Sequence, residues 1–371
     1  MKLVFWGAVA FIAYTYLGYP LWLYVRSRWW GRPIRAASIF PQVSILMAVH
    51  NEEKALPQKL RNLTELDYPQ DRYEIIVISD GSTDATNQVL KAETQSRLRV
   101  LIFLEHQGKA AALNRGIELA QGEILVFTDA RQPIDANALK YLVSNFADPE
   151  VGCASGELVL ADSHGGAAPG AGVGLYWKLE KKIREWEGAA RSVVGATGCL
   201  YAVRKRLIAP IPAGTILDDV YLPLLVARQG GRVVFESRAL AFDRVAAGRR
   251  EFWRKVRTLV GNYQLVRIAP WLLTRANPVR VEFVCHKLLR LLVPFALGAA
   301  LVSSLCLKGT LYELALVLQV VFYAMSALTI FRRRLGIVSR LADVSLAFLL
   351  LNMAAVAFVY FVTGRKTVWI R

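Results

Sequence analysis

The chain has little cysteine and little histidine. Its 371 residues include 4 Cys and 4 His. The cysteines, Cys153, Cys199, Cys285 and Cys306, have none of the pair spacings typical of a zinc site, and no two histidines are spaced i, i+4. We therefore expect no metal centre built from these residue types, and we expect reduced thiols on a cytosolic face.

Acidic residues are scarce beside basic ones. The chain has 29 Asp and Glu against 46 Lys and Arg, which gives a net charge of +17. An excess of this size is compatible with nucleic-acid binding. Much of it, however, lies next to long apolar runs, where anionic lipid headgroups account for it. No nucleic-acid partner is therefore predicted.

Apolar residues, in contrast, are abundant. They make up 54% of the chain, and the mean hydropathy of +0.33 is high for an ordinary soluble domain. The run from Leu3 to Val25 has no charge and is long enough for a helix to cross the hydrocarbon core of a membrane. A signal peptide is the alternative, but the run is longer than a signal core, and no small-x-small cleavage site precedes Arg26.

Three more candidate spans lie near the C-terminus, at residues 288–307, 312–331 and 341–362. Basic residues follow the first run, open the second span and separate the third from the fourth, and the positive-inside rule places all three groups on the cytosolic side. The sequence thus predicts an integral protein of the inner cell membrane, with residues ~30–287 in the cytosol. Four spans counted from these cytosolic groups place the C-terminal tail outside the cell. Basic residues in the tail argue against that position, so the side of the tail stays open.

Between the apolar runs, strand-like stretches alternate with helical patterns. The stretches are residues 42–49, 74–79, 99–104 and 123–128, and a helical pattern follows each one. Parallel strands need crossover connections and have continuous apolar sequences, so the pattern predicts an α/β domain whose mainly parallel sheet carries helices on both faces. Ligands of such sheets bind beyond the carboxyl ends of the strands.

Polar residues follow each of these stretches. They are His50-Asn51-Glu52, then DGSTD at 80–84, HQGK at 106–109 and Asp129-Ala130-Arg131. Turn formation and helix capping alone explain DGSTD. Four such strand ends on one edge of a sheet instead favour a site for a nucleotide diphosphate and its metal.

The ordered motifs HNEE, DGSTD, GKAAALNRG, TDAR, TGCLYAVRK and LDDVYLPLLVARQGGRVVFE resemble those of the membrane-bound family 2 glycosyltransferases, relatives of cellulose, hyaluronan and poly-N-acetylglucosamine synthases. The resemblance covers about residues 41–266 and extends to the pattern of flanking spans. It implies a GT-A nucleotide-diphospho-sugar transferase domain that inverts the anomeric carbon in one displacement. The expected domains are residues 1–30 (a membrane helix with its basic border), 40–248 (catalytic), 249–275 (an amphipathic interfacial helix) and 286–371 (a membrane region with three spans).

The resemblance assigns donor-binding residues to the strand ends. Glu52 and Asp80 match positions that recognise the base and the ribose, and a first-turn helix acid is the alternative for Glu52. Lys109 follows Gly108 at an expected helix start, where an ammonium group and free N–H groups attract phosphate, unless it is a solvated lysine. Asp84 is expected mainly to cap a helix.

Asp129 matches the first acid of the family's Asp-x-Asp pair, and Arg131 replaces the second. Residues two apart on a strand point the same way, so both side chains are expected in the cleft. One carboxylate, diphosphate oxygens and water together can hold Mg²⁺ or Mn²⁺, so a metal with Asp129 as its protein ligand is predicted. Arg131 is assigned either to the donor phosphates or to a salt bridge with a neighbouring acid.

The catalytic pair implied by the resemblance is Asp218 and Asp219, with Asp219 as the general base for the acceptor; two capping acids are the alternative. A helix N-terminus lowers the pKa of a carboxylate, so a base here needs burial or Asp218 to raise it. Thr197, Gly198 and Cys199 match the loop on the acceptor side, where Cys199 is expected to pack rather than to act as a nucleophile.

The chain lacks the Gln-x-x-Arg-Trp signature of processive synthases. The corresponding residues 249–265 have the pattern of an amphipathic helix on the membrane, and Arg254 and Arg257 are candidates for contact with the donor diphosphate or with anionic lipid. We expect the transfer of a single sugar from a nucleotide sugar to a lipid-linked acceptor or a short growing glycan. The expected donor is a UDP-sugar. A catalytically weak membrane scaffold of a polysaccharide export complex is the alternative, with Arg131 as its best argument.

Overall fold

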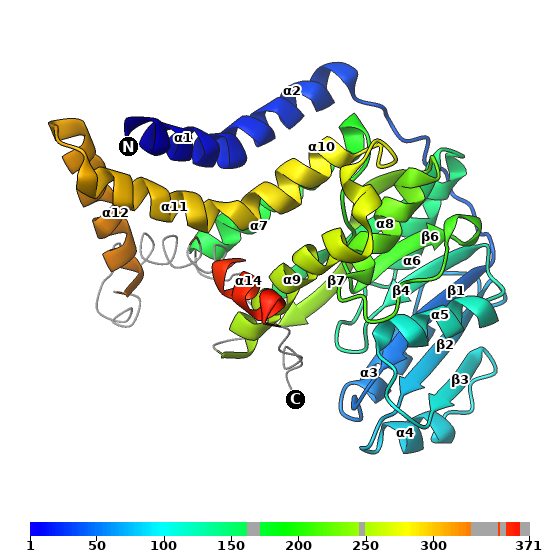
Figure 1. The fold of residues 1–371 in the computed structure, drawn as a ribbon. Coiled ribbons are helices and arrows are strands. Elements are labelled where there is room, and N and C mark those ends of the chain that lie inside the picture. The colour runs from blue at the N-terminus through cyan, green and yellow to red at the C-terminus, as the bar shows by residue number, and fades with distance from the viewer. Residues whose placement is uncertain (162–170, 245–248, 328–347, 349–353, 364–371) are drawn as a thin grey trace.

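The computed structural model describes residues 1–161, 171–244, 249–327, 348 and 354–363. In these residues an α/β domain lies beside a group of long apolar helices (Figure 1). Helices α1 (Lys2–Ala13) and α2 (Tyr19–Trp30) are joined by the π-helical turn η1 (Tyr14–Gly18), and they run alongside the helix that contains α10 and α11.

The domain is built on one seven-stranded sheet with the order β3-β2-β1-β4-β6-β5-β7. The strands are β1 (Val43–Val49), β2 (Tyr73–Asp80), β3 (Leu98–Phe103), β4 (Ile124–Thr128), β5 (Val151–Ala161), β6 (Leu200–Arg204) and β7 (Arg232–Arg244). Strands β3, β2, β1 and β4 are mutually parallel, as are β5 and β7, whereas β6 runs antiparallel to β4 and β5. The predicted mainly parallel α/β domain is confirmed, although no pattern in the sequence indicates the reversed strand β6.

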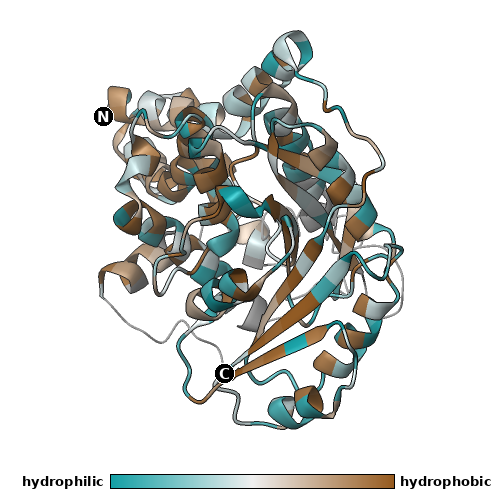
Figure 2. Cartoon of the chain, turned by 90° about the vertical axis from the view of Figure 1, so that its right-hand side faces the viewer, coloured by the Kyte–Doolittle hydropathy of each residue, from teal (hydrophilic) through white to brown (hydrophobic). Residues whose placement is uncertain are grey.

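Helices cover both faces of the sheet. One face packs on α3 (Leu56–Thr64), α4 (Thr86–Ala92), α6 (Ala138–Ser144) and the 3-10 turn η2 (Asn145–Ala147), and the other on α5 (Lys109–Leu119) and α8 (Asp218–Arg228). Ile45 and Ile75 are buried on the first face, and Leu46 and Ile76 on the second. The central strands are therefore apolar on both sides, and Figure 2 shows them mainly in the hydrophobic colour.

The remaining α-helices lie between the domain and the apolar group or within that group, whereas the 3-10 turn that follows β6 lies in the domain. They are α7 (Ala171–Ala190), α9 (Arg249–Ile268), α10 (Arg280–Phe283), α11 (Leu289–Cys306), α12 (Thr310–Ala327) and α14 (Ala354–Val362), with the short turns η3 (Lys205–Leu207), η4 (Pro270–Leu273) and η5 (Val284–Leu288). Helices α10, η5 and α11 form one continuous segment.

Two continuous helical segments, Lys2–Trp30 and Arg280–Cys306, are long and apolar enough to cross a membrane, and Thr310–Ser326 is a shorter apolar helix. The first segment contains the predicted N-terminal run, and the second begins at Arg280 rather than near residue 288. Of the span predicted at 341–362, only residues 348 and 354–362 are described, and the end of the preceding span, 328–331, also lies outside the described residues.

The amphipathic segment predicted at 249–275 corresponds to α9 and η4. The apolar face of α9 packs inside the protein, where Val256 and Val260 are buried with Ala357 of α14. An apolar stripe at helical spacing is stabilised by any apolar partner, whether a helix or a lipid surface. Contact of α9 with a membrane therefore stays a prediction.

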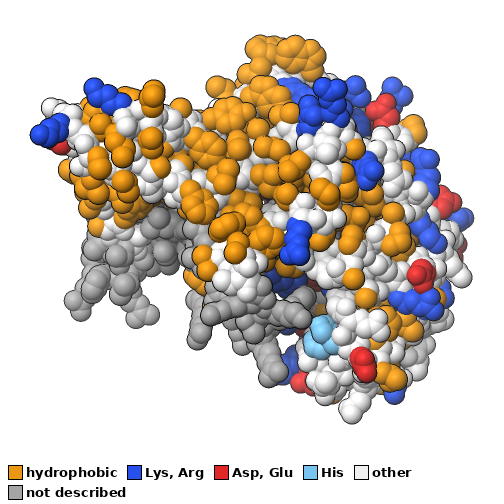
Figure 3. All heavy atoms as spheres, viewed as in Figure 1, with side chains coloured by type: hydrophobic (Ala, Val, Ile, Leu, Met, Phe, Trp, Pro, Cys, Tyr) orange, Lys and Arg blue, Asp and Glu red, His pale blue; other side chains and the backbone are white. Residues whose placement is uncertain are grey.

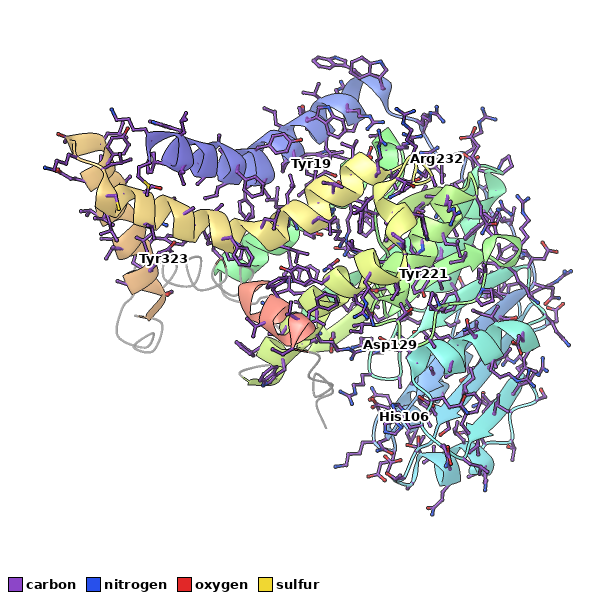
Figure 4. The ribbon with its side chains drawn as sticks, in the orientation of Figure 1. Tyr19, His106, Asp129, Tyr221, Arg232 and Tyr323 are labelled. Atoms are coloured by element: carbon purple, nitrogen blue, oxygen red, sulfur yellow. The ribbon has the colours of Figure 1, made fainter. Side chains whose placement is uncertain are left out.

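Polar contacts fix the two long apolar segments to the domain. Tyr19 points from α2 toward the α10–α11 segment (Figure 4), and its hydroxyl donates to Glu187 of α7 at 2.7 Å. The ring nitrogens of His286 lie 2.7 Å from Glu187 and 2.9 Å from Glu180, and Arg290 donates to Glu180 at 2.9 Å. The charges of these buried carboxylates are thus compensated. Loss of one hydrogen-bond or ion-pair partner would leave a buried charge without compensation in apolar surroundings.

Candidate active site

Asn51 joins the loops that follow β1 and β2. Its φ of 56° lies in the left-handed region, which Asn tolerates better than most residues with a side chain. Its side-chain oxygen accepts the N–H of Thr83 at 2.8 Å. Asp84 accepts the N–H groups of Thr86, the first residue of α4, and of Glu53, although the N-cap residue itself is Ala85. The sequence did not predict this role of Asn51, which was noted only as part of the HNEE motif.

Asp80 fixes the loop that leads into α5. Its carboxylate is buried and accepts the backbone N–H groups of Gln107 and Gly108 at 2.7 and 2.8 Å, while a ring nitrogen of His106 lies 2.9 Å from it. Gly81 has a φ of 62°, and a Cβ there would collide with the backbone of His106. Asp80 therefore positions this loop, and its contact with a nucleotide stays a prediction.

Lys109, the first residue of α5, brings two separate acidic motifs together. Its ammonium nitrogen lies 3.1 Å from Asp129 and 3.5 Å from Asp218. Burial alone would lower the pKa of Lys109, but attraction by Asp129, Asp218 and Asp219 raises it above its ordinary value. Lys109 thus stays positively charged at the edge of the sheet. Figure 4 shows Asp129 on the side of the domain that faces α9 and α14.

Arg131 forms a salt bridge with Glu52. Its Nε lies 2.8 and 2.9 Å from the two carboxylate oxygens, and this hydrogen bonding raises the pKa of Arg131. The Arg131 side chain is 69% exposed and that of Glu52 is 17% exposed. We considered two roles for Arg131, contact with the donor phosphates and a salt bridge to a neighbouring acid, and the structure has the salt bridge. The pair connects the ends of β1 and β4.

Asp129 is the predicted metal ligand. Its side chain is 39% exposed and contacts Lys109. The parts of the chain that the structure describes contain no group of three or more His, Cys, Asp or Glu placed to hold a metal ion. A single open carboxylate fits Mg²⁺ or Mn²⁺ only when phosphate oxygens and water complete the coordination shell. The residues present are therefore compatible with a metal that arrives with a diphosphate.

A buried lysine supports this strand end from behind. Lys59 of α3 donates to the Thr128 hydroxyl at 2.8 Å and to the Gln132 carbonyl at 2.5 Å, and burial lowers its pKa to about 8. Thr128 in turn donates to the Cys199 carbonyl at 3.0 Å. Lys59 therefore holds the segment that carries Asp129. Sequence reasoning missed it, because a lysine on an amphipathic helix is usually solvated.

The two acids at the start of α8 have different surroundings. Asp218 is buried, lies near Lys109 and accepts a hydrogen bond from Tyr201 at 3.3 Å. Asp219 lies against Gly198, where an added Cβ would be 2.8 Å from a carboxylate oxygen. Burial, followed by repulsion from Asp218, raises the pKa of Asp219 to about 6. The condition for a base at this helix N-terminus is therefore met.

The loop that contains residues 197–199 is held by buried hydrogen bonds. The Thr197 N–H donates to the Ser155 hydroxyl at 2.9 Å, and the Thr197 hydroxyl accepts a bond from Arg184 at 2.8 Å. Cys199 is buried, and burial raises the pKa of its thiol to about 12. The thiol is therefore protonated at neutral pH, as expected of a packing residue rather than a nucleophile.

A cavity of about 390 Å³ begins at Asp219, Thr197 and Gly198 and extends between α7, α9 and the η5–α11 segment. Its apolar lining includes Tyr16, Leu158, Trp177, Leu259 and Leu291. Tyr16 and Leu291 belong to the two segments that are long enough to cross a membrane. The site thus opens from the Asp219 carboxylate toward the apolar helices.

Arg254 of α9 connects this cavity to the end of β4. It lines the cavity and lies 3.4 Å from the Asp243 carboxylate, which also accepts a hydrogen bond from Gln132 at 3.1 Å. Arg257 is half-buried and is not part of the cavity lining. The structure thus brings Arg254, but not Arg257, to the acceptor-side residues.

The sheet order and the polar strand ends define a GT-A type glycosyltransferase fold. Residues 44–208 match the family model described as Glycosyl transferase family 2. The chain carries a domain of glycosyl transferase family 2, a class of enzymes that transfer sugars from nucleotide sugars, which confirms the family predicted from its motifs.

Curated relatives match parts of the chain. Beta-monoglucosyldiacylglycerol synthase of Nostoc sp. (strain PCC 7120 / SAG 25.82 / UTEX 2576) is 32% identical over 170 residues, which are 44% of this chain and 36% of that protein. Poly-beta-1,6-N-acetyl-D-glucosamine synthase of Staphylococcus aureus (strain COL) is 25% identical over 230 residues, 60% of this chain and 55% of that protein. The chain therefore spans about a third to about half of the length of these relatives.

A solved structure resembles the chain over nearly its whole length. It is the mannosyltransferase PcManGT from Pyrobaculum calidifontis in complex with GDP-Man and Mn²⁺, with a TM-score of 0.73 and 22% sequence identity, covering 98% of this chain and 100% of that one. At this level of identity the likeness shows the fold.

Proposed function

We propose that the chain is a membrane-bound inverting glycosyltransferase. It moves a sugar from a nucleotide sugar to a lipid-linked or growing glycan acceptor in the synthesis of a cell-surface or exopolysaccharide. The observation that carries this proposal is the position of Asp219, a carboxylate with a pKa of about 6. It lies between the Lys109–Asp129 pair on one side and the cavity on the other.

The donor occupies the strand ends. Lys109 and the N-terminus of α5 bind the diphosphate, because an ammonium group and free N–H groups both attract phosphate. Glu52, held in place by Arg131, and Asp80 lie at the ends of β1 and β2 and contact the nucleoside. Asp129 would hold Mg²⁺ or Mn²⁺, which would supply charge neutralisation for the departing diphosphate.

The acceptor approaches from the cavity. Asp219 takes the proton of the acceptor hydroxyl. At the same time the oxygen of that hydroxyl forms a bond to the anomeric carbon, and the bond between this carbon and the diphosphate oxygen breaks. A base with a pKa of about 6 is mostly ionised at neutral pH, yet it binds a proton more readily than an ordinary Asp. Asp218 keeps Lys109 close and raises the pKa of its neighbour.

Exposed apolar surface supports the membrane location. Leu3, Leu17 and Leu305 are 90%, 71% and 65% exposed. Figure 3 shows hydrophobic side chains over α1 and α11, and Lys and Arg gathered near the end of α2 beside the domain. An apolar surface of this kind marks an interaction with lipid or protein. The basic border favours an inner-membrane protein whose catalytic domain faces the cytosol.

The test is a panel of UDP-, GDP- and TDP-sugars given to the purified protein with a cell lipid extract. We expect nucleoside diphosphate release with at least one donor, and we expect EDTA to stop it. Release that continues in EDTA would instead assign leaving-group stabilisation to cationic side chains alone. No release with any donor would contradict the enzyme and favour the catalytically weak scaffold of a polysaccharide export complex.

A further inference from the structure

The cavity that begins at Asp219 carries more positive than negative charge. Its cationic side chains are Arg184, Arg254, Lys255, Lys287 and Arg290, and its carboxylates are Glu180 and Asp219. Glu180 already bonds Arg290 and His286, each at 2.9 Å. Arg254 is also paired with Asp243 at 3.4 Å, so the cation that an anionic occupant would chiefly compensate is Lys287.

Lys287 is the cation with the clearest need for a partner. It is half-buried and lines the cavity, and no salt bridge or hydrogen bond of its ammonium group is found among the residues that the structure describes. Its attraction opposes the rise in the pKa of Asp219, so the two groups act on each other within one cavity. A ligand that reaches Asp219 is therefore also exposed to the field of Lys287.

Asn262 of α9 provides an independent sign of a missing ligand. It is buried, it lines the same cavity, and its side-chain oxygen accepts no hydrogen bond within the described chain, although its NH₂ group donates to the Thr258 carbonyl at 3.0 Å. A buried acceptor without a donor costs free energy. A hydroxyl group of an occupant would satisfy it.

The remaining lining is apolar. Tyr16 and Leu291 come from the two long apolar segments, and Trp177 lies on α7. One cavity therefore combines an excess of cations, an unsatisfied acceptor atom, a candidate base and contact with apolar helices. An amphipathic molecule with an anionic, hydroxyl-bearing headgroup matches all four features.

The geometry points to a phosphate-bearing lipid as the acceptor, with its phosphate at Lys287 and a free headgroup hydroxyl at Asp219. Arg184 and Arg290 flank the phosphate, and the acyl chains leave between the apolar helices. This inference rests on the proposed function and specifies its acceptor class. Inorganic phosphate shares the anionic chemistry but lacks the apolar part, so the experiment separates the two.

The test measures lipid binding in the absence of a donor. Dioctanoyl phosphatidylglycerol and dioctanoylglycerol have the same acyl chains and both carry a hydroxyl, but only the first has a phosphate. Their affinities for the full chain in neutral detergent can be measured by calorimetry. We expect phosphatidylglycerol to bind at least about tenfold more tightly, as a charge-assisted contact requires.

The matched variants are Lys287→Gln and Lys182→Gln. Both remove one positive charge, but Lys182 lies on the exposed side of α7, paired with Glu185. We expect Lys287→Gln to remove most of the preference for phosphatidylglycerol, and Lys182→Gln to keep it. Lys287→Arg retains the positive charge and should retain the preference for phosphatidylglycerol. This result would show that the loss in Lys287→Gln comes from the missing charge rather than from misfolding.

Three results would overturn the inference. They are equal affinity of the wild type for the two lipids, an unchanged preference in Lys287→Gln, or displacement of both lipids alike by millimolar inorganic phosphate, which would show a site for free anions. Because no nucleotide sugar is present, this outcome is independent of the proposed function, which fails only if no donor is consumed in the donor panel.

Discussion

The two proposed halves of the site, one for the donor and one for the acceptor, are built differently. The donor half consists of loops at the ends of β1, β2 and β4, and its residues are joined by short contacts such as those of Arg131 with Glu52 and Lys109 with Asp129. The acceptor half consists of helices α7, α9 and α11 around a cavity. The first half is fixed by the sheet, whereas the second depends on helices that also contact the apolar segments.

Asp219 lies where these halves meet. Its neighbour Asp218 contacts Lys109 on the donor side, and Asp219 itself lies against Gly198 at the start of the cavity. Changes at this junction should therefore affect transfer far more than donor binding. Changes in the donor half should affect donor binding far more than transfer.

The largest effect is expected from Asp219→Asn, which removes the base but keeps the shape of the side chain. We expect the rate of transfer to fall by about 10²–10⁴-fold, the usual contribution of a general base, with donor affinity nearly unchanged. Transfer assays and calorimetry with the donor measure the two quantities. Asp71→Asn, a change in an 80% exposed side chain, is the matched control. Loss of donor binding in Asp219→Asn would assign this carboxylate to the nucleotide instead.

A smaller loss is expected from Gly198→Ala. The new Cβ would lie 2.8 Å from an Asp219 oxygen, so the carboxylate has to move. Displacement of a reacting group by about 1 Å costs about 10²-fold in rate. Gly7→Ala, at a position with no atom within 4 Å of the added Cβ, should leave transfer unchanged. Wild-type activity in Gly198→Ala would show that the position of Asp219 does not limit the reaction.

The pH dependence of kcat/KM also tests the role of Asp219 at this junction. The pKa of Asp219 is raised to about 6, and only its ionised form accepts a proton, so kcat/KM should be level above pH 6 and fall about tenfold per pH unit below it. In Asp218→Asn the repulsion that helps to raise this pKa is absent, so the acid limb should move to lower pH. An acid limb that stays in place would mean that another group controls it.

The smallest effect is expected from Arg131→Gln in the donor half. Because the Arg131 side chain is 69% exposed, its salt bridge to Glu52 contributes at most about 1 kcal/mol. We expect the KM for the donor to rise up to about fivefold with kcat nearly constant. Arg115→Gln, which removes an exposed ion pair with Glu118, is the control. A large loss of kcat would show that Arg131 contacts the departing phosphates.

The donor half was largely predictable from the sequence. Parallel strands with two buried faces have continuous apolar runs, and their polar ends must meet at one edge, so Glu52, Lys109 and Asp129 could be placed near one another. The partner of Arg131 could not be chosen, because both candidate partners are anionic and only the loop geometry separates them. Lys59 could not be found, because its burial depends on packing between α3 and the end of β4.

The acceptor half was much less predictable. Glu180, Lys287 and Asn262 share no motif, and they meet only because α7, α9 and η5 pack around one cavity. The amphipathic pattern of α9 predicted an apolar partner but not which one, and part of that partner is α14. The antiparallel strand β6, which carries the chain from the 197–199 loop back beside β4, has no distinct signal in the apolar pattern.

The most direct test of the two-sided site is an experimental structure with a nucleoside diphosphate and Mn²⁺. We expect the diphosphate at Lys109 and the metal at Asp129, with Asp219 free of nucleotide contacts and facing an open cavity. A diphosphate bound inside the cavity at Lys287, or a metal held by Asp219, would contradict the division into donor and acceptor halves.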